Sequence, residues 1–236
     1  MLNSALMRAS IHHPSEDHMK TQSHLEIGSS KLAYRKTGEG PDIMFIHGWP
    51  LHRETWRDTV SRLPNYTCHL IDLPGTGATI TPASTDVSLS GHIDAMVAAI
   101  EQLDLDDVVL VGQDSGGLIA RYVTARVPER VSALVVTGTE IPFSWPAAIT
   151  RLQLASRLPG SERLTMRLMN SPMFARSNLL FGGAFWNRDL LEGEFRTKVL
   201  DQTFRDREAV RRQLAVLLTF TKKLVNGLAE IHPKIS

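Results

Sequence analysis

The chain has 236 residues, of which 42% are hydrophobic and 22% are charged, and its formal net charge is +1. This composition excludes a disordered or collagen-like protein, and the length is sufficient for a sizeable core. No apolar run approaches the roughly 20 residues of a spanning helix, so we expect no membrane segment. The single cysteine, Cys68, excludes an internal disulfide framework and favours a reducing, cytoplasmic location.

Charge is distributed unevenly along the chain. Residues 1–140 carry a net negative charge and residues 141–236 a net positive charge. This change of sign suggests two structural units. No Lys/Arg cluster interleaves with aromatic residues as a nucleic-acid groove requires, so we expect no nucleic-acid partner.

The first part of the chain alternates between strand and helix patterns. Residues 1–23 are polar and His-rich and predict a flexible N-terminal extension without a signal peptide. Short apolar runs then predict strands at 24–28, 31–37, 42–46, 67–71, 108–111 and 131–137. Helical patterns fall between them at 55–63, 88–103 and 116–127. The alternation predicts an α/β fold, with a mostly parallel sheet and flanking helices, over residues 24–140.

After Glu140 the pattern becomes helical. Helices are predicted at 147–158, 163–169, 190–200 and 206–224, and no segment there reads as a core strand. We interpret residues 141–225 as a helical cap and residues 226–236 as a linker that leads back toward the core.

The most informative segment runs from a buried strand through small residues directly into a helix, at Val108–Gly117. A turn this tight strains its central residue and pushes that side chain out above the sheet, beside a helix N-terminus that stabilises negative charge. Gly112 and Gly116 lie two positions either side of Asp114, whereas the bulky Gln113 precedes Ser115 by two. Asp114 is therefore the nucleophile candidate, and the Ser115 backbone N–H would point at the reacting oxygen or the leaving group.

Other interpretations of this turn stay open. Asp114 could be a helix N-cap, and glycine-rich turns also occur in nucleotide-binding folds. Neither dinucleotide nor P-loop spacing is met here, and no cofactor is implied. A serine hydrolase that uses Ser115 is disfavoured by Gln113.

A second motif, His47-Gly48-Trp49-Pro50, directly follows the predicted strand at 42–46. A His-Gly turn at a strand end leaves backbone N–H groups free to face a cavity, as an oxyanion hole requires. The N–H groups of Trp49 and Ser115 would be the two donors. His47 is a candidate substrate contact.

With these two motifs and the segment Ile71-Asp72-Leu73-Pro74-Gly75-Thr76-Gly77, the sequence resembles the α/β-hydrolase family over roughly residues 24–236. An Asp at the nucleophile position looks like the epoxide hydrolase and haloalkane or haloacid dehalogenase branch. The resemblance implies attack by Asp114 on an sp³ carbon, giving an alkyl-enzyme ester that a His-activated water then hydrolyses. The expected substrate is a small, mostly apolar organic molecule.

The individual activities of this branch each lack a part. Dehalogenases of the family place Trp or Arg beside the nucleophile, where this chain has Ser115. Epoxide hydrolases share the His-Gly-aromatic-Pro form, but they supply two tyrosines from the cap. The tyrosines of this chain are Tyr34, Tyr66 and Tyr122, and none of them lies in the predicted cap. Epoxide hydrolase is the closest match by motif. A dehalogenase and a non-catalytic binding protein of the same fold are the alternatives.

Further site residues are expected around the nucleophile. Glu140, just after a predicted core strand, is a candidate catalytic acid. Aromatic residues of the cap, Phe143, Trp145 and Trp186, could line an apolar substrate pocket. No metal site is predicted.

The catalytic histidine has no convincing candidate. His232 is the one histidine after Asp114, four residues from the end, where packing around a side chain is poor. We therefore expect a chain truncated after its cap, without the last core strands and the catalytic histidine, and impaired in turnover. Its open sheet edge could mediate self-association.

Overall fold

The structure is a computed structural model and describes residues 23–177, 183 and 187–235. Its centre is a six-stranded sheet in the order β1-β2-β4-β3-β5-β6. The strands are β1 (Ser23–Ile27), β2 (Ser30–Thr37), β3 (Asp42–Ile46), β4 (Thr67–Ile71), β5 (Val108–Gln113) and β6 (Val131–Thr137). All six predicted strands are confirmed. Across the described ranges, no helix is long and apolar enough to cross a membrane.

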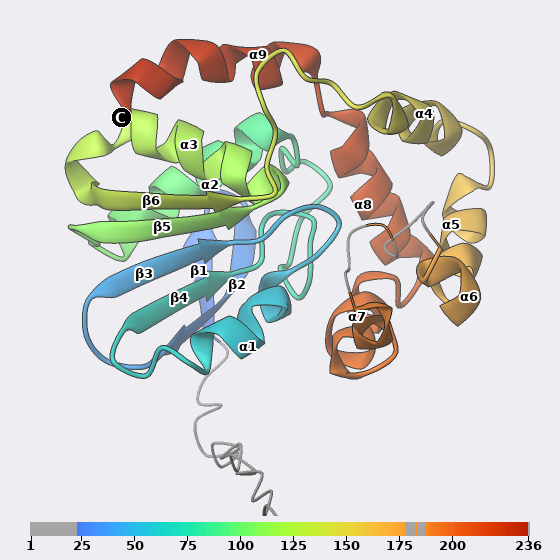
Figure 1. Cartoon of the computed structure of the whole chain (residues 1–236), viewed down its shortest axis with the longest axis horizontal. Helices are drawn as coiled ribbons and strands as arrows, with labels where there is room; N and C mark the ends of the chain where they lie inside the picture. The colour runs from blue at the N-terminus through green and yellow to red at the C-terminus, as the bar shows by residue number, and fades with distance from the viewer. Residues whose placement is uncertain (1–22, 178–182, 184–186, 236) are drawn as a thin grey trace, which may run out of the picture.

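The sheet is antiparallel at one edge and parallel elsewhere. β2 pairs antiparallel with both β1 and β4, and the pairs β3·β4, β3·β5 and β5·β6 are parallel. The carboxyl ends of β3, β5 and β6 therefore lie on the same side of the molecule, at one end of the strands (Figure 1). In an open parallel sheet, ligands bind beyond the carboxyl ends of the strands.

Helices cover the two faces of the sheet unequally. α2 (Leu89–Gln102) and α3 (Ser115–Arg126) pack on one face, and α9 (Lys222–Ile231) lies against α3 (Figure 1). The short helices η2 (Arg53–Trp56) and α1 (Arg57–Val60) cover part of the other face. The predicted helix at 55–63 is therefore shorter and partly 3₁₀.

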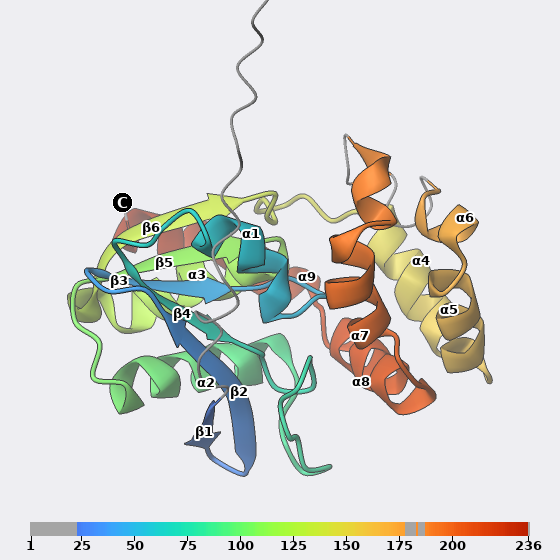
Figure 2. The ribbon, with the colours of Figure 1, turned by 90° about the horizontal axis from the view of Figure 1, so that it is seen from below.

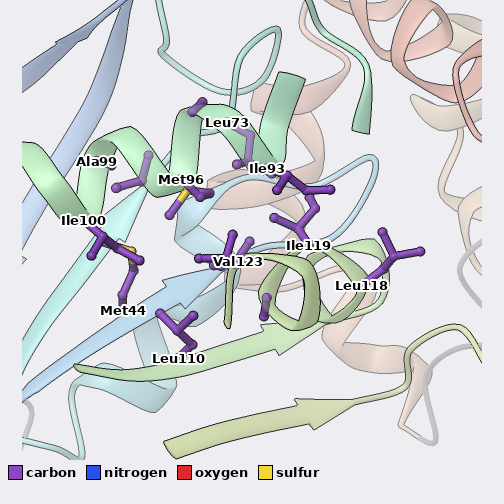
Figure 3. Close-up of a cluster of buried hydrophobic side chains, with 14 of the residues drawn as sticks. Met44, Leu73, Ile93, Met96, Ala99, Ile100, Leu110, Leu118, Ile119 and Val123 are labelled. Carbon is purple, nitrogen blue, oxygen red and sulfur yellow. The ribbon is translucent and has the colours of Figure 1, made fainter. Parts of the chain in front are cut away.

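Alternation along the strands builds a separate core on each face. Met44 points into the cluster formed with α2 and α3, where it meets residues such as Met96, Ile119 and Val123 (Figure 3). Its neighbour Phe45 points into the opposite cluster and packs against Trp56, with ring centroids 5.2 Å apart. A strand buried on both faces is typical of a parallel sheet between helical layers.

At the β6 edge the cover is thin. Within the described residues β6 pairs with β5 alone, and Val135 and Val136 are 52% and 38% exposed. Self-association through this edge stays a prediction.

Apart from η3 (Pro128–Arg130), which leads into β6, and the C-terminal η7 (His232–Lys234), the remaining helices gather beyond the carboxyl ends of the strands (Figure 2). They are α4 (Ala147–Ser156), α5 (Ser161–Met169), α6 (Pro172–Ala175), η5 (Arg188–Leu191), η6 (Arg196–Leu200, a π-helix), α7 (Asp201–Thr203) and α8 (Arg207–Leu218). The cap is therefore residues 141–220 and not the predicted 141–225, because α9 begins at Lys222 and packs on the core. The two long helices predicted at 190–200 and 206–224 are each broken into shorter pieces.

The segment that we expected to be a linker, 226–236, is helical as far as Lys234. Residues up to Ile231 belong to α9, and His232–Lys234 form the 3₁₀ helix η7. The apolar side chains of α9 explain the difference, because Val225 and Leu228 are buried in the same core cluster as α2 and α3. α9 is thus a core helix in its packing.

Candidate active site

The turn between β5 and α3 has the strained geometry that its sequence predicts. Asp114 adopts φ 53° and ψ −134°, outside the ordinary regions for a residue with a side chain. A Cβ atom on Gly112 would lie 2.4 Å from the Gly116 carbonyl oxygen, so this position tolerates only glycine. Asp114 is fixed through its backbone, because its N–H donates to the Thr137 carbonyl at 3.1 Å and its carbonyl accepts from Gly117 N–H at 2.8 Å.

The His-Gly turn after β3 lies against Asp114. A Cβ atom on Gly48 would lie 2.6 Å from the Asp114 Cβ, so glycine is what allows the two turns to touch. Trp49 N–H donates to Ser115 Oγ at 2.9 Å. The backbone N–H groups of Ser115 and Trp49 also act to lower the pKa of the Asp114 carboxyl group, against the effect of burial. Both predicted oxyanion-hole donors therefore converge on Asp114.

The protonation of Asp114 is set by its surroundings. Burial, and secondarily the negative charge of Glu140, raise its pKa from 3.8 to about 7, while the N–H groups of Ser115 and Trp49 act in the opposite direction. Burial disfavours the charged form of a carboxyl group. Near pH 7 the side chain therefore exists partly as the carboxylate, which is the form that can attack carbon.

Asp114 lines a cavity of about 860 Å³ that lies between the sheet and the cap. Its walls are mainly apolar and come from the core loops and from α4, α5, α8 and α9. They include Trp49, Leu89, Ile149, Leu168, Leu217 and Phe220. A pocket of this size with few polar groups suits a small organic molecule.

Glu140 also lines this cavity, in the loop after β6, the strand that pairs with β5. Thr139 Oγ1 donates to Glu140 Oε2 at 2.9 Å. The buried Arg121 donates through Nη2 to Thr139 Oγ1 at 2.6 Å and to the Glu140 carbonyl at 2.8 Å. Glu140 thus faces the cavity from a segment that α3 holds in place.

His47, expected as a substrate contact, does not line this cavity. Its side chain is 1% exposed. Nδ1 lies 3.0 Å from the Gly48 carbonyl, and Nε2 accepts the Leu73 N–H at 3.1 Å and lies 3.1 Å from Thr76 Oγ1. Burial is the main cause that lowers the pKa of His47 to about 4. The neutral ring joins two loops of the core.

The three aromatic candidates differ in their positions. Trp145 lines the cavity, and its indole N–H donates to Thr150 Oγ1 at 2.8 Å. Phe143 does not line it: with φ at 63° and its N–H bonded to Asn226 Oδ1, this turn residue leaves its side chain 77% exposed. Trp186 lies outside the described residues.

No histidine of the described part of the chain lines the cavity. His232 is elsewhere, with Nε2 3.2 Å from Arg121 Nη1. Over the same ranges, no three His, Cys, Asp or Glu side chains gather to hold a metal ion.

Sequence reasoning missed Gln213, a buried residue of α8 that lines the cavity. Val210 and Leu217, one turn away on either side, also line it. The sequence signal for Gln213 is a single amide side chain on an otherwise apolar face of a predicted helix.

Comparisons with known proteins agree with this architecture. Residues 41–199 match the family model described as alpha/beta hydrolase fold. Over 154 residues the chain is 33% identical to a haloalkane dehalogenase of Mesorhizobium japonicum, covering 61% of this chain and 50% of that protein. Over 121 residues it is 32% identical to a pimeloyl-[acyl-carrier protein] methyl ester esterase of Vibrio campbellii, covering 49% of this chain and 44% of the esterase. The chain thus spans about half the length of these curated relatives.

Solved structures show the same fold at lower sequence identity. The epoxide hydrolase CorEH aligns with a TM-score of 0.72 at 18% identity, covering 89% of this chain and 77% of that one. A mutant of the haloalkane dehalogenase DatA from Agrobacterium tumefaciens aligns with a TM-score of 0.68 at 20% identity, covering 89% and 74%. These likenesses concern the fold. Together with the family match over most of its length, they show that the chain belongs to the α/β-hydrolase fold family.

Proposed function

We propose that this protein is a hydrolase that uses Asp114 as a nucleophile and forms an alkyl-enzyme ester with a small, mostly apolar organic substrate. The observation that carries this proposal is the position of Asp114: a carboxylate held at a strained turn, under two backbone N–H donors, at the floor of an apolar cavity.

The first step follows from the chemistry of a carboxylate. An Asp114 oxygen attacks an sp³ carbon, a carbon–oxygen bond forms, and the leaving group departs with the electrons of the broken bond. The mainly apolar walls favour binding of an apolar substrate beside the carboxylate. In the second step the N–H groups of Trp49 and Ser115 would stabilise the oxyanion formed when water attacks the ester carbonyl.

Ser115 is less suited to act as the nucleophile. Its side chain is 2% exposed, and its Oγ accepts the Trp49 N–H. It also does not line the cavity. These contacts favour a role for the Ser115 backbone rather than its hydroxyl group, and they argue against a serine esterase mechanism.

Epoxide opening is the reaction that we favour, and displacement of halide is the alternative. The motif around Trp49 is typical of epoxide hydrolases and favours epoxide opening. An opening epoxide needs a proton donor, however, and no tyrosine of the described residues lines the cavity, which favours the alternative. A halide ion leaves without a proton. Glu140, in the cavity wall, is proposed as the acid that partners a catalytic histidine in this fold and not as the proton donor to the epoxide.

Hydrolysis of the ester needs a general base, and no histidine in the described part of the cavity wall supplies one. We therefore propose that the alkyl-enzyme ester accumulates on this 236-residue chain. Sustained multiple turnover by the same chain would contradict this second part of the proposal.

The test is intact-protein mass spectrometry after incubation with styrene oxide or 1-bromohexane. We expect a mass increase of one adduct for the native chain and for Ser115→Ala, and none for Asp114→Asn. An unchanged adduct on Asp114→Asn would overturn the proposal.

A non-catalytic binding protein of the same fold is the rival outcome. In that case the native chain would bind apolar ligands, such as hexane-1,2-diol, without any mass increase. Calorimetric binding that is equal in the native chain and Asp114→Asn, with no adduct on either, would favour it.

A further inference from the structure

The guanidinium group of Arg121 is the centre of a hydrogen-bond network beside the candidate active site. Arg121 lies on α3 and is buried. Its Nε donates to the Gly117 carbonyl, one turn earlier on the same helix, at 3.1 Å. Its Nη2 bonds to the Thr139 hydroxyl and the Glu140 carbonyl, and its Nη1 lies 3.2 Å from His232 Nε2. One side chain therefore connects α3, the loop after β6 and the C-terminal η7.

The directions of the hydrogen bonds follow from the chemistry of the groups. A guanidinium group only donates, so Thr139 Oγ1 accepts the bond from Arg121 at 2.6 Å. The single hydroxyl hydrogen of Thr139 is then directed to Glu140 Oε2, at 2.9 Å. Consecutive hydrogen bonds polarise and strengthen one another. The Glu140 carboxylate is therefore held by a hydroxyl group whose orientation Arg121 fixes.

Gly117 gives Thr139 the space to reach this position. A Cβ atom on Gly117 would lie 2.7 Å from both Cβ and Oγ1 of Thr139. Residues four apart lie on the same face of a helix, so Arg121 extends over the turn that Gly117 leaves without a side chain. The spacing of Gly117 and Arg121 thus brings Thr139 against α3.

The network ends at the cavity that contains the nucleophile candidate. Thr139, Glu140 and Asp114 all line the cavity wall. Burial, and secondarily the negative charge of Glu140, raise the pKa of Asp114. Glu140 is therefore the group through which Arg121 and Thr139 can act on the nucleophile.

We propose that Arg121 and Thr139 are positioning residues that hold the Glu140 carboxylate toward Asp114, and that they thereby set the pH range in which Asp114 attacks. This inference rests on the proposed function and adds the contacts that control its nucleophile. Without the Thr139 hydroxyl group, the Glu140 side chain loses its hydrogen bond and turns away from the like charge of Asp114.

The experiment is the pH–rate curve for alkylation of Asp114 by 1-bromohexane, followed by intact-protein mass spectrometry. Thr139→Val removes the hydroxyl group and keeps a branched side chain, whereas Thr139→Ser keeps the hydroxyl group. Glu140→Gln gives the midpoint of the curve when the charge is absent. We expect Thr139→Val to move the midpoint down by about 0.5 pH unit, at least half of the shift in Glu140→Gln, and to raise the rate below the midpoint about threefold. Thr139→Ser should keep the native midpoint.

A double variant separates positioning from a general structural effect. If Thr139 acts through Glu140, Thr139→Val combined with Glu140→Gln should have the midpoint of Glu140→Gln alone, within about 0.2 pH unit. Arg121→Met should shift the midpoint in the same direction as Thr139→Val. Where the loss of this buried guanidinium group prevents folding, the two Thr139 variants decide the question.

The matched control is Thr124→Val. Thr124 is a buried threonine of α3 whose Oγ1 donates to the Ala120 carbonyl, and it does not line the cavity. It should leave the midpoint unchanged. Tyr122 and His232 are the other titratable side chains beside Arg121, so the curves are repeated in Tyr122→Phe and His232→Asn backgrounds, where the Thr139→Val shift should persist.

Three results would overturn the inference. They are an unchanged midpoint in Thr139→Val, the same midpoint in Thr139→Val and Thr139→Ser, and additive shifts in the double variant with Glu140→Gln.

Failure of the underlying function would look different. If 1-bromohexane does not alkylate the native chain, the nucleophile proposal fails. The positioning role is then judged by carbon-13 NMR titration of the Asp114 carboxyl group, with Asp114→Asn to assign its signal. A midpoint that falls in Thr139→Val but not in Thr139→Ser supports the inference, and equal midpoints contradict it.

Discussion

The core around Asp114 and the cap above it differ in how tightly they are built. Around the nucleophile, Leu118 and Ile119 of α3 are fully buried and the glycines leave no room for a methyl group. In the cap, α4 and α5 contain no buried residue, and Leu158 and Leu164 line the cavity while being 61% and 59% exposed. The difference teaches that the core holds the reacting group in one position, whereas much of the cavity wall is a thin layer.

The largest contrast is expected between two glycines. Gly112→Ala would force a methyl group to within 2.4 Å of the Gly116 carbonyl oxygen, whereas nothing lies within 4 Å of a methyl group on Gly193 in the cap. We expect the first change to lower the free energy of unfolding by about 4 kcal/mol or more, and the second to change it by less than about 0.5 kcal/mol. Urea denaturation measures both. Similar losses of unfolding free energy in the two variants would contradict the difference in packing between the core and the cap.

A smaller contrast is expected between two leucines. Leu118→Ala removes a fully buried side chain from the cluster in Figure 3 and should cost about 3 kcal/mol. Leu164→Ala removes a side chain that is already more than half exposed and should cost less than about 1 kcal/mol. Urea denaturation of the two variants measures both losses in the free energy of unfolding. A cost at Leu164 equal to that at Leu118 would show that the cap is packed like the core.

The smallest effect concerns the pH dependence of the nucleophile. Asp114 attacks as a carboxylate, so its alkylation rate should rise with pH through its pKa of about 7 and then level off. The charge of Glu140 contributes to that raised pKa, after burial. Glu140→Gln should therefore move the midpoint of the pH–rate curve to lower pH, while Glu129→Gln on the core surface should not. A midpoint that stays fixed or moves upward in Glu140→Gln would contradict the predicted coupling.

The sequence predicted the core far better than the cap, for physical reasons. Strands buried on both faces, such as β3 and β5, leave continuous apolar runs, and the spacing of Gly112, Asp114 and Gly116 admits few backbone geometries. The positions of Asp114, Trp49 and Ser115 could therefore be expected from residue types alone.

The cap left weaker signals. Its aromatic residues predict a pocket lining, yet Phe143 lies on a turn and its side chain is exposed to solvent. Thr219 ends α8 and Thr221 caps α9, although their shared apolar pattern suggested one helix. Gln213 and the Arg121–Thr139–Glu140 contacts depend on side chains far apart in sequence, which periodicity does not report.

The most direct test of the central claim is to locate the adduct by fragmentation mass spectrometry after reaction with 1-bromohexane. The account predicts a hexyl ester on Asp114, formed faster at pH 8 than at pH 5 and absent from Asp114→Asn. A hexyl group found instead on Glu140 or Ser115, with Asp114 unmodified, would contradict it.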